Sequence, residues 1–313
     1  MACALDSVKF VQRYCLEKIK RMIKIIPEDI SNSQLHKLLL GAIGPRPIAF
    51  ASTIDEEGNP NLSPFSFFNV FGVNPTTLIF SPSRRNRDNS VKNTYENVKV
   101  VPEVVINVVT YEMVNQVSLA STEYPKGVDE FVKAGFSKVP SEKVRPFRVK
   151  ESPVQIECKV REVIETGQGG GSANLIICEV LAMHIHEDVL AEDGLIDQQK
   201  IRLVGRMGRD WYSKAFGDGI FHVEKPLDKI GIGIDALPEN IRFSKYLTGN
   251  DLGKLGNLEK LPERSEIEAM ESMQEVQEAL KDSDDRESGI CHIARKYLED
   301  NRVADALKIL MLL

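Results

Sequence analysis

Two long extended segments constrain the fold of this chain more than any other feature. Residues 154–164 alternate apolar and polar side chains, as expected of a strand with one buried face. Residues 174–185 are predicted to form a second long strand. The connection, residues 167–172, is rich in glycine but lacks the Lys-Ser/Thr of a phosphate-binding P-loop and leads into a strand, not a helix. We therefore predict a β-hairpin.

Shorter elements surround this hairpin. Predicted strands cover residues 48–54, 61–70, 77–81 and 104–110, and predicted short helices cover residues 88–97, 113–121 and 128–134. The first two strands are expected to form a hairpin. The regular strand–helix alternation of a doubly wound parallel sheet is missing. The pattern predicts a mainly β fold, either an antiparallel barrel or a sandwich.

We expect three segments: an N-terminal helix at 1–26, the β domain at 27–225 and an extension at 226–313. The first helix is basic, so a transit peptide, a membrane-surface helix or a packing helix would fit; Asp6 and Glu17 argue against transit, and packing is preferred. In the extension, residues 230–258 are glycine-rich and loop-like, whereas 265–281 and 288–312 favour helices. This extension is more typical of a partner-binding or dimer-packing element than of a catalytic unit.

Composition excludes several classes of function. The 313 residues have a net charge of −6, which gives no basis for a broad nucleic-acid-binding face. No apolar run reaches the roughly 18 residues of a membrane span. A secretory signal is also lacking, so we expect a cytoplasmic protein. The five cysteines form no CxxC pair and are expected to be free thiols.

A basic stretch after the strand at 77–81 is the strongest candidate for a ligand site. It contains Arg84, Arg85, Arg87 and Lys92 among serine and threonine hydroxyls, and it leads into a predicted helix. Guanidinium groups, hydroxyls and helix-start N–H groups are the donors that bind a phosphate monoester. A solvated charged loop is the alternative interpretation.

Polar and aromatic residues on the neighbouring strands suggest a site for a flat ring. Ser52 and Thr53 lie on one strand, and residues 63–69 on the next include Phe67 and Phe68. Hydroxyl and amide groups can bind the polar edge of a ring while an aromatic side chain packs against its face. The alternative is an ordinary barrel strand with phenylalanines in the core.

Other motifs give weaker hypotheses. His184 and His186 would face the same side of a strand, but no third metal ligand has suitable spacing. The chain shows neither a G-x-S-x-G motif nor a paired His/Cys nucleophile, so hydrolase chemistry has little support.

At these residues the chain resembles the flavin reductase-like, FMN-binding split-barrel family, in its flavoredoxin-like branch. The resemblance spans about residues 27–212. Its motifs, in family order, are Pro45-Arg46-Pro47-Ile48-Ala49-Phe50, Ser52-Thr53, Asn61-Leu62-Ser63-Pro64-Phe65-Ser66-Phe67-Phe68-Asn69, Asn74-Pro75, Ser81 with Arg84, Lys92-x-Thr94-x-x-Asn97, Tyr124-Pro125-x-Gly127-x-Asp129-Glu130-Phe131 and Glu151-Ser152-Pro153-Val154. Where the family has Lys-Asp-Thr, this chain has Lys92-Asn93-Thr94.

The resemblance implies an antiparallel FMN-binding split barrel of Greek-key type with short helices, here followed by an α-helical C-terminal extension. It also implies a homodimer with the flavin near the subunit interface. The residues that it assigns to the FMN phosphate are Ser81, Ser83, Arg84, Lys92 and Thr94. Those that it assigns to the isoalloxazine ring are Ser52, Thr53, Ser66, Phe67 and Asn69. Tyr124 would lie where substrate enters, and Arg206 and Tyr212 resemble a late family motif.

Three functional hypotheses follow. In the first, the protein is an oxidoreductase that passes hydride from NADH or NADPH to FMN and electrons onward to a second acceptor. The cofactor performs that chemistry, so no side chain is assigned as catalytic. In the second, it is a non-enzymatic electron carrier or FMN-holding partner that docks through its helical extension. The third is a flavin-free barrel that binds another phosphorylated ligand.

Overall fold

The structure is a computed structural model that describes residues 22–281 and 285–313. Most of the N-terminal helix predicted at 1–26 falls on residues 1–21, which lie outside the described part, and residues 22–26 are not helical. The chain divides into one compact unit, Lys24–Phe221, and a second that contains His222–Leu313. Among the described residues, no helix is long and apolar enough to cross a membrane.

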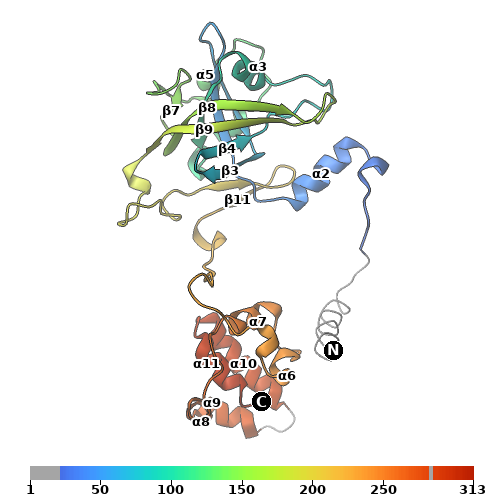
Figure 1. Cartoon of the computed structure of the whole chain (residues 1–313), viewed down its shortest axis with the longest axis vertical. Helices are drawn as coiled ribbons and strands as arrows, with labels where there is room; N and C mark the ends of the chain where they lie inside the picture. Colours follow the sequence, from blue (N-terminus) through green and yellow to red (C-terminus); the bar gives the residue numbers. More distant parts are fainter. Residues whose placement is uncertain (1–21, 282–284) are drawn as a thin grey trace. The chain divides into compact units, whose positions relative to one another are not determined.

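One antiparallel sheet organises the unit Lys24–Phe221 (Figure 1). Within the described residues it has seven strands in the order β2-β1-β5-β8-β9-β4-β3. The strands are β1 (Ala49–Ile54), β2 (Pro60–Phe65), β3 (Phe68–Val73), β4 (Thr76–Phe80), β5 (Glu103–Val108), β8 (Val154–Glu165) and β9 (Asn174–Ile185). β8 and β9 pair along their whole length, which confirms the predicted hairpin. This sheet and its short helices confirm the predicted mainly β fold.

The predicted strand 61–70 is wrong in one respect, because the structure breaks it into β2 and β3 at Ser66 and Phe67. β2 pairs with β1 at one edge of the sheet, whereas β3 pairs with β4 at the other edge. Two linking residues span at most about 10 Å, so the two edges of the sheet must approach each other there. The sheet therefore curls into a barrel that is split between β2 and β3.

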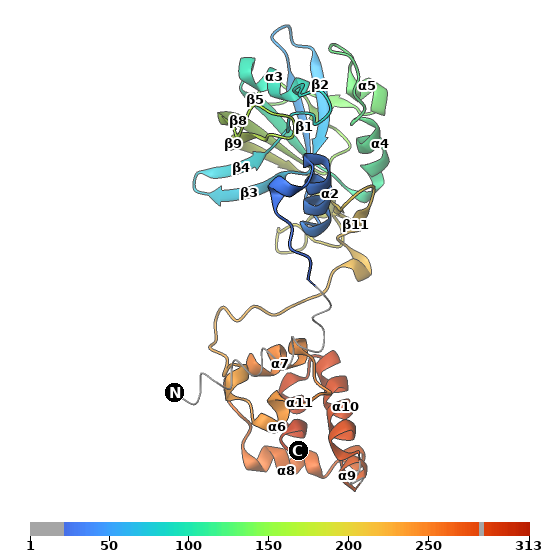
Figure 2. The ribbon, with the colours of Figure 1, turned by 90° about the vertical axis from the view of Figure 1, so that its right-hand side faces the viewer.

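Helices and small hairpins cover this sheet (Figure 2). The helices of the unit are η1 (Pro27–Asp29), α2 (Asn32–Ala42), α3 (Asn93–Val100), η2 (Tyr111–Met113), α4 (Val114–Leu119), α5 (Glu130–Ala134), η3 (Glu187–Val189) and η4 (Gly217–Gly219). The small hairpins are β6 (Lys138–Val139) with β7 (Arg148–Val149), and β10 (Val204–Arg206) with β11 (Tyr212–Lys214).

Both faces of β1 are buried, which separates two apolar cores. Ala51 faces the barrel interior, where it joins Phe80 and Ile106. Phe50 faces the other way and joins Val117 of α4 and Phe131 of α5. Alternation along β1 thus decides which core each side chain enters.

The helix predicted at 88–97 begins later than expected, at Asn93. Asp88 instead accepts a hydrogen bond from the Ser90 N–H at 3.0 Å, and the Val91 carbonyl accepts one from Arg85 at 2.6 Å. These local bonds favour a turn over a helix. The basic stretch is consequently a loop held by its own side chains.

The second unit is helical and has its own core, which includes Ile241, Leu252, Ile290 and Leu307. Its helices are η5 (Ile234–Ala236), α6 (Glu239–Arg242), α7 (Gly249–Gly256), α8 (Arg264–Glu271), α9 (Gln274–Lys281), α10 (Arg286–Glu299) and α11 (Val303–Leu310). The loop-like interpretation of residues 230–258 is therefore wrong.

Helix α7 forms despite its glycines because its N-terminus is capped and its apolar face is buried. Thr248 and Asp251 make a reciprocal capping box at its start. Leu252 and Leu255 are completely buried in the helical core. The segment 265–281, predicted as helical, is divided between α8 and α9.

Candidate functional site

The candidate site lies at the split in the barrel, where Ser66 and Phe67 connect the two edges. The Ser81 N–H at the end of β4 donates a hydrogen bond to the Phe67 carbonyl at 2.9 Å. This bond brings the loop after β4 against the β2–β3 junction. Two stretches that the sequence linked to a ring and to a phosphate are thereby adjacent.

A cavity of about 290 Å³ opens at this junction. It is lined by six of the ten predicted FMN-binding residues: Ser66, Phe67, Ser81, Ser83, Arg84 and Lys92. Arg85 of the predicted basic stretch and Pro64 and Phe65 of the family motif also line it. The rest of the lining was missed by sequence reasoning: His36, Leu40, Asn86 and Gly171. A neighbouring cavity of about 290 Å³ under α2 shares His36, Asn86 and Gly171 with it.

Two groups at the cavity suit a bound ligand. The Ser81 side-chain oxygen is buried and has no hydrogen-bond partner among the described residues. Buried polar groups are normally paired, so this hydroxyl is available to a ligand that reaches it. The Phe67 ring is 41% exposed, and His36 of α2 meets it edge-on with 6.2 Å between ring centroids. A flat apolar surface thus lies beside polar donors.

Arg46, of the Pro45-Arg46-Pro47 motif, links several segments around this junction through hydrogen bonds. Its guanidinium donates to the carbonyls of Leu40 and Ile43 at the end of α2, and to the Met207 carbonyl at 3.0 Å. It also donates to the Ser66 hydroxyl at 3.3 Å. Arg46 therefore fixes α2 and Ser66 relative to each other.

The glycine-rich hairpin connection also belongs to the site. Arg84 N–H donates to the Ser172 carbonyl at 2.9 Å, and Gly171 N–H donates to the Arg84 carbonyl at 3.0 Å. Gly171 has a φ of +88°, and a Cβ there would lie 2.6 Å from the Asn86 side-chain oxygen. Only glycine fits this close approach. The glycine run was the sequence signal for this contact, although sequence reasoning assigned it only a turn.

The basic loop supplies the charge of the site. Arg84 is held by two hydrogen bonds to Asn89, to its side-chain oxygen at 2.8 Å and to its carbonyl at 3.0 Å. Arg85 donates to the Ser90 hydroxyl at 2.9 Å. Burial lowers the pKa of the Lys92 ammonium, and the nearby Arg85 guanidinium lowers it further. Three cations, Arg84, Arg85 and Lys92, thus line the same cavity.

Four predicted site residues do not line the cavity. Thr53 and Thr94 are fully buried in a polar network, in which Asn61 donates to the Thr53 hydroxyl at 3.2 Å and to the Thr94 hydroxyl at 2.9 Å. Ser52 is also fully buried but lies on the opposite face of β1 from Thr53. Asn69 is exposed and accepts a hydrogen bond from its neighbour's N–H. Their assignment to FMN stays a prediction.

Tyr124 lines a small second cavity that Arg85 and Lys92 share with the first. This second cavity is also lined by Asn93, the residue that departs from the family pattern, and by Thr94 and Asn61 of the polar network. Glu130 lines it from α5, accepting the Leu62 N–H at 3.1 Å, and burial raises the pKa of its carboxyl. The two cavities therefore meet at the same pair of cations.

The remaining candidates lie elsewhere in the unit. The Arg206 guanidinium stacks on the Tyr212 ring, with 4.7 Å to its centroid, and neither residue lines the cavity at the split. His184 Nε2 contacts the buried Glu157 carboxylate at 2.7 Å, while His186 contacts Asp188 at 3.2 Å. The described residues contain no group of three potential metal ligands.

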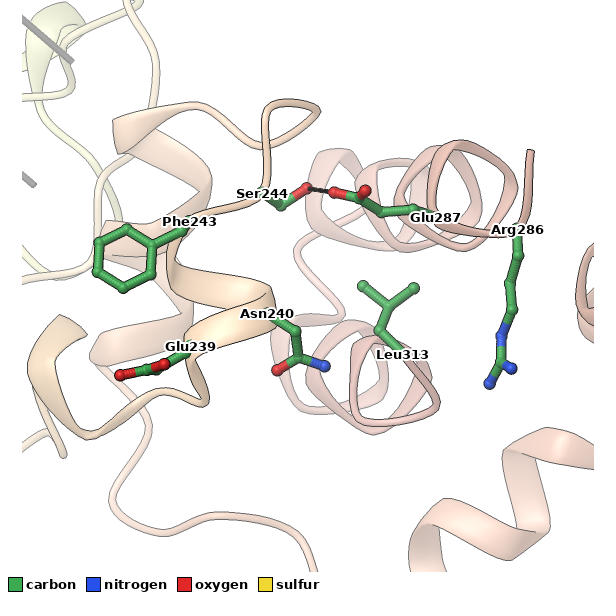
Figure 3. Close-up of a pocket in the computed structure, with 7 residues that line it drawn as sticks. All are labelled: Glu239, Asn240, Phe243, Ser244, Arg286, Glu287 and Leu313. Atoms are coloured by element: carbon green, nitrogen blue, oxygen red, sulfur yellow. Dashed lines mark hydrogen bonds between the residues drawn. The ribbon is translucent and has the colours of Figure 1, made fainter. Parts of the chain in front are cut away.

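The helical unit has a cavity of its own, of about 510 Å³ (Figure 3). Phe243, Asn240 and Leu313 face it, and Ser244 at its rim donates to Glu287 at 2.7 Å. Arg286 donates to the Leu312 carbonyl at 2.5 Å. Ser244, Glu287 and Arg286 are thus hydrogen-bonded within the helical unit.

Comparisons with known proteins agree with this architecture. A family profile described as a flavin reductase like domain matches residues 42–203. A protein of Aquifex aeolicus is 35% identical over 196 residues, which are 63% of this chain and 97% of that protein. About a third of this chain therefore has no counterpart in that relative.

Solved structures show the same fold. Component B of nitrilotriacetate monooxygenase from Bacillus cereus is similar with a TM-score of 0.60 and 26% identity, over 65% of this chain and all of that one. Flavoredoxin of Desulfovibrio vulgaris is similar in fold, with a TM-score of 0.50 and 23% identity over 58% of this chain and 91% of that one. With the split sheet and its cavity, these findings confirm the resemblance: this chain belongs to the flavin reductase-like family of split-barrel proteins.

Proposed function

We propose that this protein is an FMN-binding oxidoreductase that passes hydride from NADH or NADPH to FMN and electrons onward to a second acceptor. Membership of the flavin reductase-like family supports flavin-dependent oxidoreductase chemistry in general. The observation that supports FMN is the cavity at the split, with the unpartnered buried hydroxyl of Ser81 inside it.

The lining residues divide into two groups that suit the two ends of FMN. Ser81, Ser83, Arg84 and Lys92 offer hydroxyl and cationic donors for a phosphate. Phe67 offers a half-exposed ring and Ser66 a hydroxyl for the isoalloxazine. Bound there, FMN would supply the hydride-accepting ring, while the protein orients it and limits its contact with water.

Substrate access is proposed from the side of Tyr124. Its loop connects α4 to α5 and lines the second cavity next to Arg85 and Lys92. A nicotinamide or an acceptor would approach the ring past this loop. No side chain is proposed as a general acid or base.

A homodimer with the flavin near the interface fits the exposed surface of the same unit. β3 is an edge strand, and its side chains Val70, Phe71 and Val73 are 56%, 64% and 84% exposed. Long apolar edge strands are normally covered. The cavity of about 290 Å³ is also slightly smaller than the roughly 300–1,000 Å³ typical of ligand sites, as expected if a second subunit completes the site. Sedimentation at equilibrium with twice the monomer mass is the expected result.

Anaerobic mixing tests the proposed reaction. The full-length protein, loaded with FMN, is mixed with NADH and separately with NADPH while absorbance near the flavin band is followed. Bleaching with one of the two donors supports the reductase. A flavin that binds but stays oxidised with both donors favours the second hypothesis, an electron carrier that docks through its helical unit. A third result, no flavin binding at all, would leave a barrel for another phosphorylated ligand.

A further inference from the structure

A carboxylate lies among the cations of the site. Glu123 Oε1 is 2.9 Å from the Arg85 Nε and 3.8 Å from the Lys92 Nζ, and Glu123 Oε2 is 2.5 Å from an Arg87 nitrogen. Glu123 belongs to the loop between α4 and α5, directly before Tyr124. One acidic side chain thus pairs with three cations, two of which line the cavity at the split.

These cations do not depend on Glu123 for their positions. Arg85 also donates to the Ser90 hydroxyl at 2.9 Å and to the Val91 carbonyl at 2.6 Å. Arg87 also pairs with Asp88 at 3.0 Å. Lys92 lies beyond hydrogen-bond distance of Glu123. The main effect of the Glu123 carboxylate is therefore to neutralise these cations and not to position them. A bound phosphate would supply the same negative charge in its place.

The pairing has an energetic consequence for any anion. Like charges at short range repel, and Glu123 relieves that repulsion for the three cations while no ligand is bound. The Arg85 and Lys92 side chains are only 20% and 28% exposed, so water screens the pair with Glu123 partially. A phosphate that uses these cations must first weaken their pairing with Glu123. The net binding free energy of the phosphate is therefore smaller than it would be without Glu123.

We propose that Glu123 competes with the phosphate of the flavin for Arg85 and Lys92, the two of its cations that line the cavity, and so keeps FMN exchangeable. In this role Glu123 is a specificity- and affinity-determining residue of the site. A flavin without a phosphate is not subject to this competition. This inference rests on the proposed FMN function.

The test compares Glu123→Gln with wild type, using the full-length protein freed of flavin. FMN, riboflavin and inorganic phosphate are each titrated, the flavins by fluorescence quenching and phosphate by competition with FMN. We expect the variant to bind FMN about tenfold more tightly, the scale of one charge-assisted interaction. Phosphate should compete at lower concentration, and riboflavin affinity should not change.

A matched control removes a carboxylate with the same chemistry elsewhere. Glu112 pairs with Arg202 and lines neither cavity, so Glu112→Gln makes the same change in net charge. It should leave FMN affinity at the wild-type value. An equal gain in this control would assign the effect to net charge.

Three results would overturn the inference. Weaker FMN binding in Glu123→Gln would make Glu123 a support for the cations, and unchanged binding would remove it from the phosphate site. A parallel gain for riboflavin would exclude an effect through the phosphate. If wild type binds riboflavin and FMN equally, only the phosphate assignment fails; if it binds neither flavin, the proposed function itself fails.

Discussion

Two sets of hydroxyl and amide groups in the barrel differ in what surrounds them. Around the cavity, the Ser81 hydroxyl is buried without a partner among the described residues. In the interior, the Thr53 hydroxyl accepts hydrogen bonds from both Asn61 and Asn97, at 3.2 and 3.1 Å. Both sets come from neighbouring strands and use the same residue types. The Ser52 hydroxyl of β1 is also buried without a partner among the described residues, so a missing partner alone does not mark a ligand site. Ser81 differs because it also lines the cavity at the split. We infer that the cavity set serves a ligand and the Thr53 network serves the fold.

This comparison predicts two separable classes of mutant. Loss of an interior group should lower the free energy of unfolding without changing the intrinsic affinity for FMN. Loss of a cavity group should lower FMN affinity with little effect on unfolding.

The largest expected effect is on stability, from Asn61→Ala. The substitution removes the Asn61 donor from the buried Thr94 hydroxyl and one of the two donors to Thr53, which keeps Asn97, and this costs up to about 3 kcal/mol of unfolding free energy. Urea denaturation measures this loss. Asn69→Ala is the control, because Asn69 is exposed and bonds only its own neighbour; its unfolding free energy should hardly change. Asn61 also lines the second cavity but not the cavity at the split, so the FMN affinity of folded Asn61→Ala should fall much less than that of Arg84→Ala. An equally large loss would show that this network also serves the ligand.

Arg84→Ala should give the largest effect on FMN binding. Loss of a charge-assisted hydrogen bond weakens FMN binding by about 1.5–3 kcal/mol, which raises the dissociation constant roughly 10- to 150-fold. Arg161→Ala is the control, since Arg161 is an exposed arginine on β8 that pairs with Glu179. Fluorescence titration compares the two. Unchanged affinity in Arg84→Ala would move the phosphate site to another part of the molecule.

Lys92 gives a pH dependence with a defined sign. Lysine binds phosphate in its protonated form, which exists below its pKa, and burial lowers that pKa. FMN affinity should therefore fall as pH rises, and at a lower pH than for an ordinary exposed lysine. Lys92→Arg should remove this alkaline loss, because arginine stays charged. The same alkaline decline in both proteins would exclude Lys92 as its source.

The smallest effect is expected from Ser81→Ala. Its hydroxyl has no partner among the residues that the structure describes, so the free energy of unfolding should stay the same or rise slightly. FMN affinity should fall by about 0.5–1.5 kcal/mol, the value of one neutral hydrogen bond. Calorimetry on the same samples can measure both quantities. A destabilised variant with normal FMN affinity would reverse the interpretation of Ser81.

Sequence reasoning predicted the strands well because their alternation is local. The β8–β9 hairpin followed from its period of two and its glycine connection. The break between β2 and β3 did not follow, because Ser66 and Phe67 lie within a continuous extended run. Their bend is set by pairing with strands at opposite edges of the sheet. Tertiary pairing of this kind leaves no local pattern.

The site was predicted in part for the same reason. Residue chemistry and family motifs located Ser66, Phe67 and the loop from Ser81 to Lys92, all of which meet at the cavity. The contacts of Gly171 with Asn86 and of Glu123 with Arg85 join segments far apart in the sequence. The burial of Thr53 depends on Asn97, which a helix brings to it. Such contacts are visible only in the folded chain.

The most direct test of the account is an FMN titration of the purified full-length protein, with its visible spectrum recorded first. We expect a flavin spectrum as purified, or saturable quenching of added FMN at one site per chain. We also expect weaker binding of riboflavin, which lacks the phosphate that Arg84 and Lys92 address. No flavin absorbance together with no FMN binding would contradict the central claim that the cavity at the split is a flavin site.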